Sequence, residues 1–471
     1  MLADLRDRCV ENVIDGPGLS AIPTASMLVP AASSLRRPPS ESARTLAGRF
    51  SLVMTARLAG AGVGFASQLV LARVLGAEPL GRLYVALSLA GVMATVCSLG
   101  FPSVTARFVA QYRTARDWSA LAAFISVSRR YSLIAACAVS GLAAVGVALA
   151  PWLARESRDA LLLGLLTTPA FTAMNLNGAT ANAHRRFGLV YVPELLGRPI
   201  LLLVAGALVT TVLAARTATV VLLLHLIGCL GLVIAQRRML RGLLPAERDT
   251  PRMRDRRAAG RRWLEHATPM IVVALFTQLF ADLEILLVSP LLAPEQVGVF
   301  AVCLRLALMT GFAVQLVQQL ILPDTAEAYS RGDTQSVRAH ILRANLLSTS
   351  ICLAAAVVIA AAGRPILTLF GKGFVDGYAC LVVLAISQVL RAAAGPAAHV
   401  LTFAGAERTT IAACAVSLVI LAASNAILAS TFGLVGAAAA VTITTVLWNT
   451  WLAALARRRA GVETTLLRLV A

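Results

Sequence analysis

The stretch VLGAEPLGRLYVALSLA (residues 74–90) recurs in related form as LLAPEQVGVFAVCLRLA (residues 291–307), 217 positions later. Seven of its seventeen positions are identical without a gap. The identities include two pairs in a polar turn, Glu78 with Glu295 and Gly81 with Gly298. Each copy carries a leucine, an acidic residue and a glycine at intervals of three before an apolar helix begins. An ungapped match across a polar turn indicates an internal duplication, because chance similarity between apolar helices does not extend into turns.

The chain around the repeat has the composition of a membrane protein. Of its 471 residues, 58% are hydrophobic and only 14% are charged, with a mean hydropathy of +0.79. A soluble domain has about a quarter of its residues charged. The apolar residues form blocks of about 18–25, the length that crosses a hydrocarbon core of about 30 Å. The blocks lie at about 50–73, 83–103, 131–152, 159–182, 188–213, 217–236, 267–290, 299–322, 344–363, 377–403, 410–430 and 435–455.

These blocks predict an all-α polytopic membrane protein with about twelve transmembrane helices. Six spans separate the two copies of the repeat, an even number, so both halves enter the membrane from the same side. Parallel six-helix repeats are typical of transporters that open a cavity between two bundles alternately to each side. The predicted domains are a disordered cytoplasmic tail (1–49), an N-terminal six-helix lobe (50–236), a basic cytoplasmic linker (237–264), a C-terminal six-helix lobe (265–456) and a cytoplasmic tail (457–471).

The formal net charge of +19 is distributed unevenly. Most basic residues fall in the first tail and in the loops on one side of the predicted membrane, and ten arginines lie between Arg237 and Arg262. Loops rich in arginine stay in the cytoplasm, so both termini and this central loop are predicted to be cytoplasmic. This alternation argues against a nucleic-acid partner. A basic cluster beside a membrane also attracts anionic lipid headgroups.

The sequence carries no catalytic or cofactor motif. Its eight cysteines are scattered, without a CxxC or a paired spacing, which indicates neither a disulfide framework nor a metal site. It contains no nucleotide-binding loop, no HExxH motif and no Ser/His/Asp arrangement. The predicted outside loops are too short to form a catalytic domain. We therefore expect a protein that is not an enzyme and that uses no cofactor.

Three arginines lie inside three different predicted spans: Arg57, Arg198 and Arg391. An ionisable side chain in a span costs roughly 2.5–3.5 kcal/mol on insertion scales, so it usually faces a bundle interior or a water-filled cavity. Arginine binds phosphate oxygens through two parallel hydrogen bonds and stays charged. These residues predict a cationic cavity that binds a phosphate or diphosphate. The alternative is that they pair with helix carbonyls or acids, or that Arg57 extends to the membrane surface.

The other charges inside spans have structural interpretations as well. Glu194 and Arg198 are four residues apart on one helical face, where they neutralise each other if they pair. Asp282 and Arg305 fall at similar depth on adjacent antiparallel spans, which predicts a salt bridge within a hairpin. Glu284 is then left over. With Asp282 it is the alternative carrier of an exchanging proton or cation.

Helix breakers occur at matching places in the two halves, at Pro169 in the fourth span and at Gly395-Pro396 in the tenth. Interrupted spans at corresponding positions point to a binding site. The fifth span carries breakers as well, around Arg198. The polar residues beside the two matching breaks, predicted to line the cavity with Arg391, are Asn175, Asn177 and Gln388.

Three stretches, taken in order, resemble a known family. LARVLGAEPLGRLYVALSLAGVMATVCSLGF (71–101) is similar to the first hairpin of polysaccharide flippases. LTLFGKGFVDGYACLVVLAISQVL (367–390) and TFGLVGAAAAVTITTVLWN (431–449) resemble later turns and spans of the same proteins. Over about residues 48–460 the chain thus resembles O-antigen and exopolysaccharide flippases. These form the polysaccharide transporter family of the multidrug/oligosaccharidyl-lipid/polysaccharide exporter superfamily.

The resemblance implies a V-shaped pair of lobes in a bacterial inner membrane. The implied cargo is an undecaprenyl-diphosphate-linked oligosaccharide, moved across the membrane for lipopolysaccharide or exopolysaccharide synthesis, with a glycan polymerase and export proteins as partners. Arg57, Arg198 and Arg391 match in kind the arginines that hold the diphosphate in such proteins. Two other functions stay open. A multidrug/cation antiporter of the same superfamily would rely on Asp282 and Glu284, and a membrane-embedded polysaccharide polymerase or ligase would need a long outside loop.

Overall fold

The computed structural model describes residues 43–210, 217–242, 253–403 and 407–466, and every regular element in these ranges is a helix. The predicted tail up to residue 42, part of the linker (243–252) and the last five residues lie outside the described part. The first half contains α2 (Ala43–Leu75), α3 (Ala77–Cys97), α4 (Phe101–Thr114), α5 (Trp118–Ala148), α6 (Arg155–Ala183), α7 (Phe187–Tyr191), the π-helix η1 (Val192–Gly197), α8 (Arg198–Leu208) and α9 (Ala218–Arg241). The second half contains α10 (Met253–Ala267), α11 (Met270–Gln278), α12 (Phe280–Val288), α13 (Pro294–Ser330), α14 (Thr334–Thr368), the 3-10 helix η4 (Lys372–Gly377), α15 (Tyr378–Ala394), α16 (Ala397–Phe403) and α17 (Glu407–Ala460).

The helices confirm a multi-pass membrane protein. Within the described ranges, nine helices are long and apolar enough to cross a membrane, and a pair bent by 70°, Gly260–Phe276 with Phe280–Val288, makes a tenth candidate. α17 joins two helical arms across a kink at Gly433, where φ is 58°. α2 contributes a shorter apolar helix, Ala59–Leu75. With the two arms of α17 counted separately, each of the twelve predicted spans overlaps one helix or a run of consecutive helices, and the end of the fifth predicted span (211–213) lies outside the described residues.

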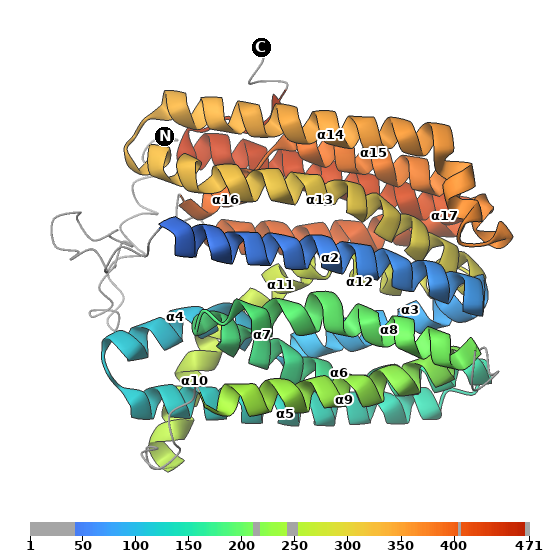
Figure 1. Cartoon of the computed structure of the whole chain (residues 1–471), viewed down its shortest axis with the longest axis horizontal. Coiled ribbons are helices and arrows are strands. Elements are labelled where there is room, and N and C mark those ends of the chain that lie inside the picture. The colour runs from blue at the N-terminus through green and yellow to red at the C-terminus, as the bar shows by residue number, and fades with distance from the viewer. Residues whose placement is uncertain (1–42, 211–216, 243–252, 404–406, 467–471) are drawn as a thin grey trace, which may run out of the picture. The chain divides into compact units, whose positions relative to one another are not determined.

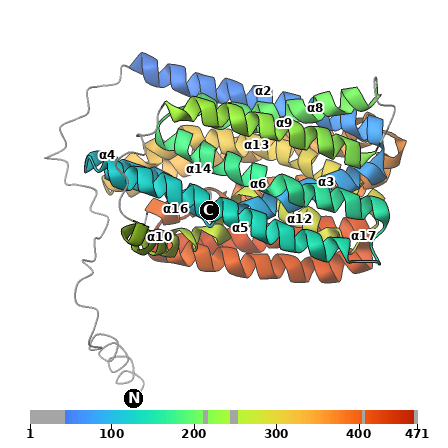
Figure 2. The ribbon, with the colours of Figure 1, turned by 90° about the horizontal axis from the view of Figure 1, so that it is seen from below.

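The helices run alongside one another in two groups that follow the two halves of the chain. Figure 1 shows α3, α5, α6, α8 and α9 on one side and α13 to α17 on the other, with α11 and α12 between them. Figure 2, turned by 90°, shows the same long helices aligned along one direction. A continuous apolar core joins the groups, since residues of α3 such as Leu80 and Leu83 cluster with Phe300 and Leu304 of α13.

The two copies of the repeat contact each other at one end of α3 and α13. A Cβ atom added to Gly81 would lie 1.9 Å from the Pro294 carbonyl oxygen, and one added to Gly298 would lie 2.0 Å from the Ala77 carbonyl oxygen. Pro294 and Gly298 are the repeat equivalents of Ala77 and Gly81. The glycine of each copy therefore packs against the equivalent carbonyl oxygen of the other copy, as in a two-fold interface. Only glycine allows this backbone approach, and we call the four residues the glycine seam.

Further contacts between the halves lie at the same end, where α2 and α14 finish. The Arg73 Nε donates a hydrogen bond of 2.6 Å to the Leu369 carbonyl oxygen. The rings of Phe65 and Phe370 meet edge to face, with centroids 5.8 Å apart. The two halves are thus held together near the glycine seam by backbone, polar and aromatic contacts.

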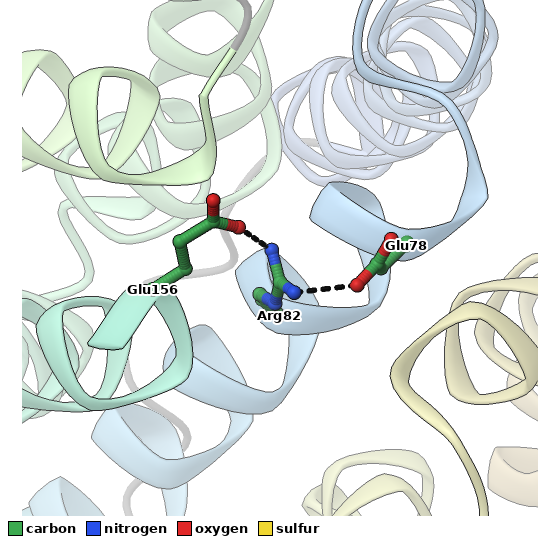
Figure 3. A network of polar contacts seen from close by, with 3 residues as sticks. All are labelled: Glu78, Arg82 and Glu156. Carbon is green, nitrogen blue, oxygen red and sulfur yellow. Dashed lines mark hydrogen bonds and ion pairs between the residues drawn. The ribbon is translucent and has the colours of Figure 1, made fainter. Parts of the chain in front are cut away.

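Only one copy of the repeat carries an ion-pair network. Arg82 lies between Glu78, one turn earlier on α3, and Glu156 at the start of α6, and pairs with both (Figure 3). The equivalent of Arg82 in the second copy is Val299, so Glu295 has no such partner there. The shared glutamate thus serves helix packing in the first half, while the shared glycines serve the contact between halves.

The predicted helix breaks are partly confirmed. The tenth span does break at Gly395-Pro396, between α15 and α16, and Gly395 has a φ of 77°. The fourth span does not break, because α6 runs on through Pro169 to Ala183. The fifth span is irregular rather than interrupted, since Pro193 falls in the π-helix η1 and Pro199 in the first turn of α8, which follows directly. The interruption expected at matching places is therefore present in the second half only.

Two segments expected to be a linker and a tail are packed against the bundles. In α10, Trp263 donates from its indole Nε1 to the Tyr112 hydroxyl at 2.8 Å and meets the Phe124 ring edge to face. After α17, Thr464 is fully buried and its carbonyl oxygen accepts a hydrogen bond of 2.6 Å from the Asn345 side chain. The sequence of neither segment is apolar enough to predict this packing.

Candidate functional site

A cavity of about 270 Å³ opens among the helices of the first half. Its wall is built from the α3–α4 junction, α6, the α7–η1–α8 segment and α9, and α11 with α12 closes it from the second half. The α3–α4 junction turns at Gly100, with a φ of 73°, where a Cβ would lie 1.9 Å from the Ala267 carbonyl oxygen. The π-helix η1 contributes Glu194 to the wall. Local irregularities of this kind are frequent at functional sites.

Arg198 is the cationic side chain of this cavity. It is the first residue of α8, and its guanidinium carbon lies 3.9 Å from the centroid of the Phe171 ring of α6. Within the described ranges it makes no ion pair and donates no hydrogen bond. The aromatic face supports the guanidinium from one side. Its N–H donors therefore remain available to a ligand.

Two carboxylates line the same cavity, and neither neutralises Arg198. Glu194, the predicted partner of Arg198, is exposed, and in the described part of the chain no ion pair joins the two. The π-helix changes the spacing that would bring residues four apart together in an α-helix. Asp282 of α12 accepts a hydrogen bond of 2.8 Å from the Ser88 hydroxyl of α3. The cavity thus contains one arginine and two acids as separate groups.

The predicted hairpin salt bridge between Asp282 and Arg305 is wrong for the described structure, which contains no ion pair between them. Both side chains point to α3 of the first half instead. Arg305 places its guanidinium carbon 3.6 Å from the centroid of the Tyr84 ring, while Asp282 engages Ser88. The two residues do lie on neighbouring helices, but both helices turn these faces toward α3. The charges therefore join the two halves rather than the hairpin.

Arg57 lies next to the cavity but does not line it. Its guanidinium carbon is 5.6 Å from the centroid of the Tyr191 ring, at the end of α7. Its Nε is buried without a hydrogen-bond partner in the described structure. The neighbouring residue Val190 does line the cavity, so Arg57 contacts the segment that forms the cavity wall.

Arg391 and Gln388 lie apart from this cavity, in the second half. Arg391 donates from Nη2 to the Gly311 carbonyl oxygen at 3.3 Å. A Cβ on Gly311 would lie 2.5 Å from the Gln388 Oε1 and 2.6 Å from the Arg391 Nη2. The Arg391 Nε and the Gln388 Oε1 are buried without partners among the described residues. The structure therefore separates Arg391 from Arg198.

The two asparagines predicted to line the cavity have different surroundings. Asn175 lines it. Asn177 is buried, accepts a hydrogen bond of 2.9 Å from Arg129 and donates to the Gln236 Oε1 at 3.4 Å. Helical periodicity explains this difference, since residues two apart on an α-helix point in different directions.

Sequence reasoning missed several polar residues around the cavity. Asn182, Thr95, Ser103 and Gln236 line it, and Ser88 anchors Asp282. The spacing of Asn182, seven residues after Asn175, was the available signal, because residues at i and i+7 share a helical face. The others come from helices distant in sequence, and no local pattern marks them.

Glu284 lies outside the cavity as well. It is 0% exposed, and its Oε2 accepts a hydrogen bond of 3.1 Å from the Asn425 side chain of α17. Its Oε1 has no partner in the described structure. Glu284 is therefore a buried acid with one amide donor, away from Arg198.

Comparison with known proteins assigns the chain to a family. The family model described as "Polysaccharide biosynthesis protein" matches residues 46–323, more than half of the chain. The chain belongs to the polysaccharide biosynthesis protein family. The matched region includes all the residues that line the cavity. Among curated proteins, none matches the chain.

Solved structures show which fold this member of the polysaccharide biosynthesis protein family has. The inward-facing structure of a multidrug resistance MATE transporter of the MOP superfamily is 15% identical, with a TM-score of 0.69, over 85% of this chain and 94% of the other. The lipid II flippase MurJ in an inward closed conformation is 14% identical, with a TM-score of 0.67, over 85% and 86%. An outward-facing MATE transporter is 14% identical, with a TM-score of 0.55, over 88% and 95%. The chain has the two-lobe fold of these transporters.

Proposed function

We propose that the protein is a flippase that moves an undecaprenyl-diphosphate-linked oligosaccharide across the bacterial inner membrane for surface polysaccharide synthesis. The observation that carries this proposal is Arg198, an arginine with free donors in a polar cavity. Family membership and the two-lobe fold support a transporter. Both termini are proposed to be cytoplasmic, from the distribution of basic residues, and a glycan polymerase and export proteins to act next.

Arg198 is proposed to hold the diphosphate. A guanidinium offers a planar pair of donors to phosphate oxygens, and such charge-assisted bonds are about twice as strong as neutral ones. No acid among the described residues forms an ion pair with Arg198. Arg57, beside the same wall, and Arg391, in the second half, are proposed to contact the diphosphate at other stages of transport.

Alternating access is the proposed mechanism. The contacts around the glycine seam hold the halves together at one end, and the cavity lies between α6 and the α11–α12 pair, toward the other end of α3. A cavity of about 270 Å³ is near the lower limit of ligand sites, roughly 300–1,000 Å³. It therefore accepts a diphosphate and a neighbouring sugar rather than a whole oligosaccharide, and opening is needed for the rest.

Glu284 is proposed as the site that couples transport to a proton or cation gradient. Burying a carboxylate without a cation or a full set of donors is costly, so such a group takes up a proton or an ion. Glu284 has one amide donor and a second oxygen that is free in the described structure. Asp282, which unlike Glu284 lines the cavity, is the alternative carrier.

One observation favours a second candidate, a multidrug/cation antiporter. The cavity exposes two carboxylates, Glu194 and Asp282, beside a single arginine. A cationic drug would be held by these acids and would be repelled by Arg198. The two functions therefore predict opposite effects of the same substitutions.

The test uses a strain that lacks its lipid-linked oligosaccharide flippase and carries this gene. Arg198→Ala should insert into the membrane normally and reduce surface glycan at least tenfold, because it removes a charge-assisted contact of about 1.5–3 kcal/mol. Arg198→Lys keeps the charge but loses the paired geometry and should restore glycan only in part. Surface glycan is measured by gel and by lectin binding.

Arg364→Ala is the matched control. Arg364 also lies over an aromatic ring, that of Tyr378 at 5.2 Å, but outside the cavity. Full glycan display by Arg198→Ala would contradict the diphosphate site. Increased resistance to cationic dyes in Arg198→Ala, lost in Asp282→Asn, would support the antiporter instead.

A further inference from the structure

One face of α6 lines the cavity with an aromatic side chain at one end, followed by amide and small side chains. The face runs through Phe171, Met174, Asn175, Gly178, Ala179 and Asn182, at helical spacing. Phe171, which lies under Arg198, forms one end. The two asparagines follow, separated by small residues, and a Cβ added to Gly178 would have no atom within 4 Å. The wall thus combines an aromatic support for a cation with amides set in open space.

The amides on this face have unused hydrogen-bonding capacity. Within the described ranges the side chains of Asn175 and Asn182 make no hydrogen bond. Asn177, on another face of the same helix, is by contrast engaged by both Arg129 and Gln236. The protein therefore satisfies the amide that it buries in the bundle and leaves open those that face the cavity.

The α3–α4 part of the wall offers hydroxyl groups. Thr95 of α3 and Ser103 of α4 line the cavity, and neither hydroxyl forms a hydrogen bond among the described residues. Amides and hydroxyls each donate and accept, so they suit a ligand that carries neutral groups of both kinds. Sugar hydroxyls have this character, whereas a cationic drug or an alkyl chain does not.

We propose that Asn175 and Asn182 of α6, with Thr95 of α3 and Ser103 of α4, form a subsite for the sugar next to the diphosphate that Arg198 holds. This inference rests on the proposed function and extends it, because it makes the protein select a glycosylated lipid over the bare lipid diphosphate. A site built to bond hydroxyls discriminates strongly against a ligand that lacks them, since its polar groups are then left unpaired.

The experiment measures binding to the full-length protein in nanodiscs with two probes, undecaprenyl diphosphate and undecaprenyl-diphosphate N-acetylglucosamine. The wild type should bind the glycosylated lipid at least tenfold more tightly. The double variant Asn175→Ala/Asn182→Ala should lose about tenfold in affinity for the glycosylated lipid and keep its affinity for the bare diphosphate. Arg198→Ala should weaken both.

Two further variants keep the test independent of folding. Gly178→Leu leaves both amides in place and fills the space beside them, so it should exclude the sugar and spare the bare diphosphate. Asn449→Ala is the control, because Asn449 bonds the Thr445 carbonyl oxygen of its own helix, outside the cavity. The apparent melting temperature of each variant reports its folding.

The outcomes separate this inference from the proposed function. Equal loss for both lipids in the double variant, or no loss for either, would overturn the sugar subsite. If both lipids still bound in a way that depends on Arg198, the proposed function would stand. Failure of the wild type to bind either lipid would overturn both.

Discussion

Glu284 and Arg391 are buried charged residues whose hydrogen-bonding groups are only partly satisfied among the described residues. Each has a buried atom without a partner in the described structure, the Glu284 Oε1 and the Arg391 Nε. Such groups are costly in a static bundle. They are more easily understood if their partners arrive during the transport cycle, a proton or cation for Glu284 and a phosphate for Arg391. Both residues are therefore tested better by transport than by stability.

Glu284→Gln tests the coupling site. Glutamine keeps the shape and an acceptor for Asn425 but cannot bind a proton or a cation, so the variant should fold normally. In proteoliposomes, an imposed gradient should stimulate transport of the glycosylated lipid at least tenfold less in this variant than in the wild type. Glu265→Gln, at an exposed acid of α10, is the control. Transport that still responds fully to the gradient in Glu284→Gln would exclude Glu284 as the coupling residue.

At the scale of elements, the third spans of the two halves begin in the same way. α5 begins after Asp117, whose Oδ1 accepts from the Ala120 N–H at 2.9 Å. α14 begins after Asp333, whose Oδ1 accepts from the Ser336 N–H at 3.0 Å. This is the N-cap arrangement, in which an acid satisfies an orphan donor of the first turn. The duplication is thus visible in helix capping as well as in the glycine seam.

These caps predict a dependence on pH. The hydrogen bond from the Ala120 backbone, followed by that from the Ser119 hydroxyl, lowers the pKa of Asp117. A pKa that is lower in the folded state than in the unfolded state stabilises the folded protein at pH values above the unfolded pKa of about 3.9. This contribution is lost as the pH falls through the lowered pKa of the folded state. Asp117→Ala should lower the apparent melting temperature by about 1–2 °C at pH 7, and the difference should shrink at pH 3.

Asp117→Asn separates the cap from the charge, because asparagine still accepts the Ala120 hydrogen bond. It should keep most of the stability at pH 7 and show no change on acidification. The pair is measured by thermal unfolding in detergent. An equal effect of Asp117→Ala at both pH values would mean that the ionised carboxylate does not contribute through this bond.

At the scale of the whole molecule, the glycine seam is the contact that the proposed alternating access must open. The seam, the Arg73 bond to Leu369 and the Phe65–Phe370 pair join the halves at one end. The contacts of α3 with Asp282 and Arg305 continue along the same helix. Because Asp282 also lines the cavity, a ligand there can compete with Ser88 and weaken the contact between halves. This gives a physical route from binding to opening.

Gly81→Val should prevent this end from closing. The added Cβ alone would overlap the Pro294 carbonyl oxygen, so the halves must separate, which shifts the population toward the opposite conformation. The readout is cross-linking between Arg73→Cys and Leu369→Cys with a short thiol reagent, which should fall at least tenfold, together with loss of transport.

Gly231→Val is the control for this prediction. Gly231 lies within α9, and a Cβ there has no atom within 4 Å, so the substitution changes helix propensity without adding a contact. It should leave the cross-link and transport intact. Unchanged cross-linking in Gly81→Val would show that the seam is not the closing contact.

The sequence alone predicts the membrane class, the approximate positions of most of the apolar helices and the repeated turn. These follow from the length of apolar blocks and from a repeated turn, which are local properties of the chain. It also predicts Arg198 and Asn175 as cavity residues, because a polar or charged side chain inside an apolar span usually faces a bundle interior or a cavity. It did not determine whether a proline interrupts its helix, since α6 runs on through Pro169 while the tenth span breaks at Pro396.

Which of these residues contact one another depends on how the helices pack. Arg198 and Arg391 look alike in the sequence, yet one lines the cavity and the other bonds the Gly311 carbonyl oxygen. Asp282 and Arg305, expected to pair, contact Ser88 and Tyr84 instead. The reason is that the rotation of each helix about its own axis is set by packing against helices far away in the sequence. A turn of one residue changes a side chain's partner without changing any pattern that the sequence displays.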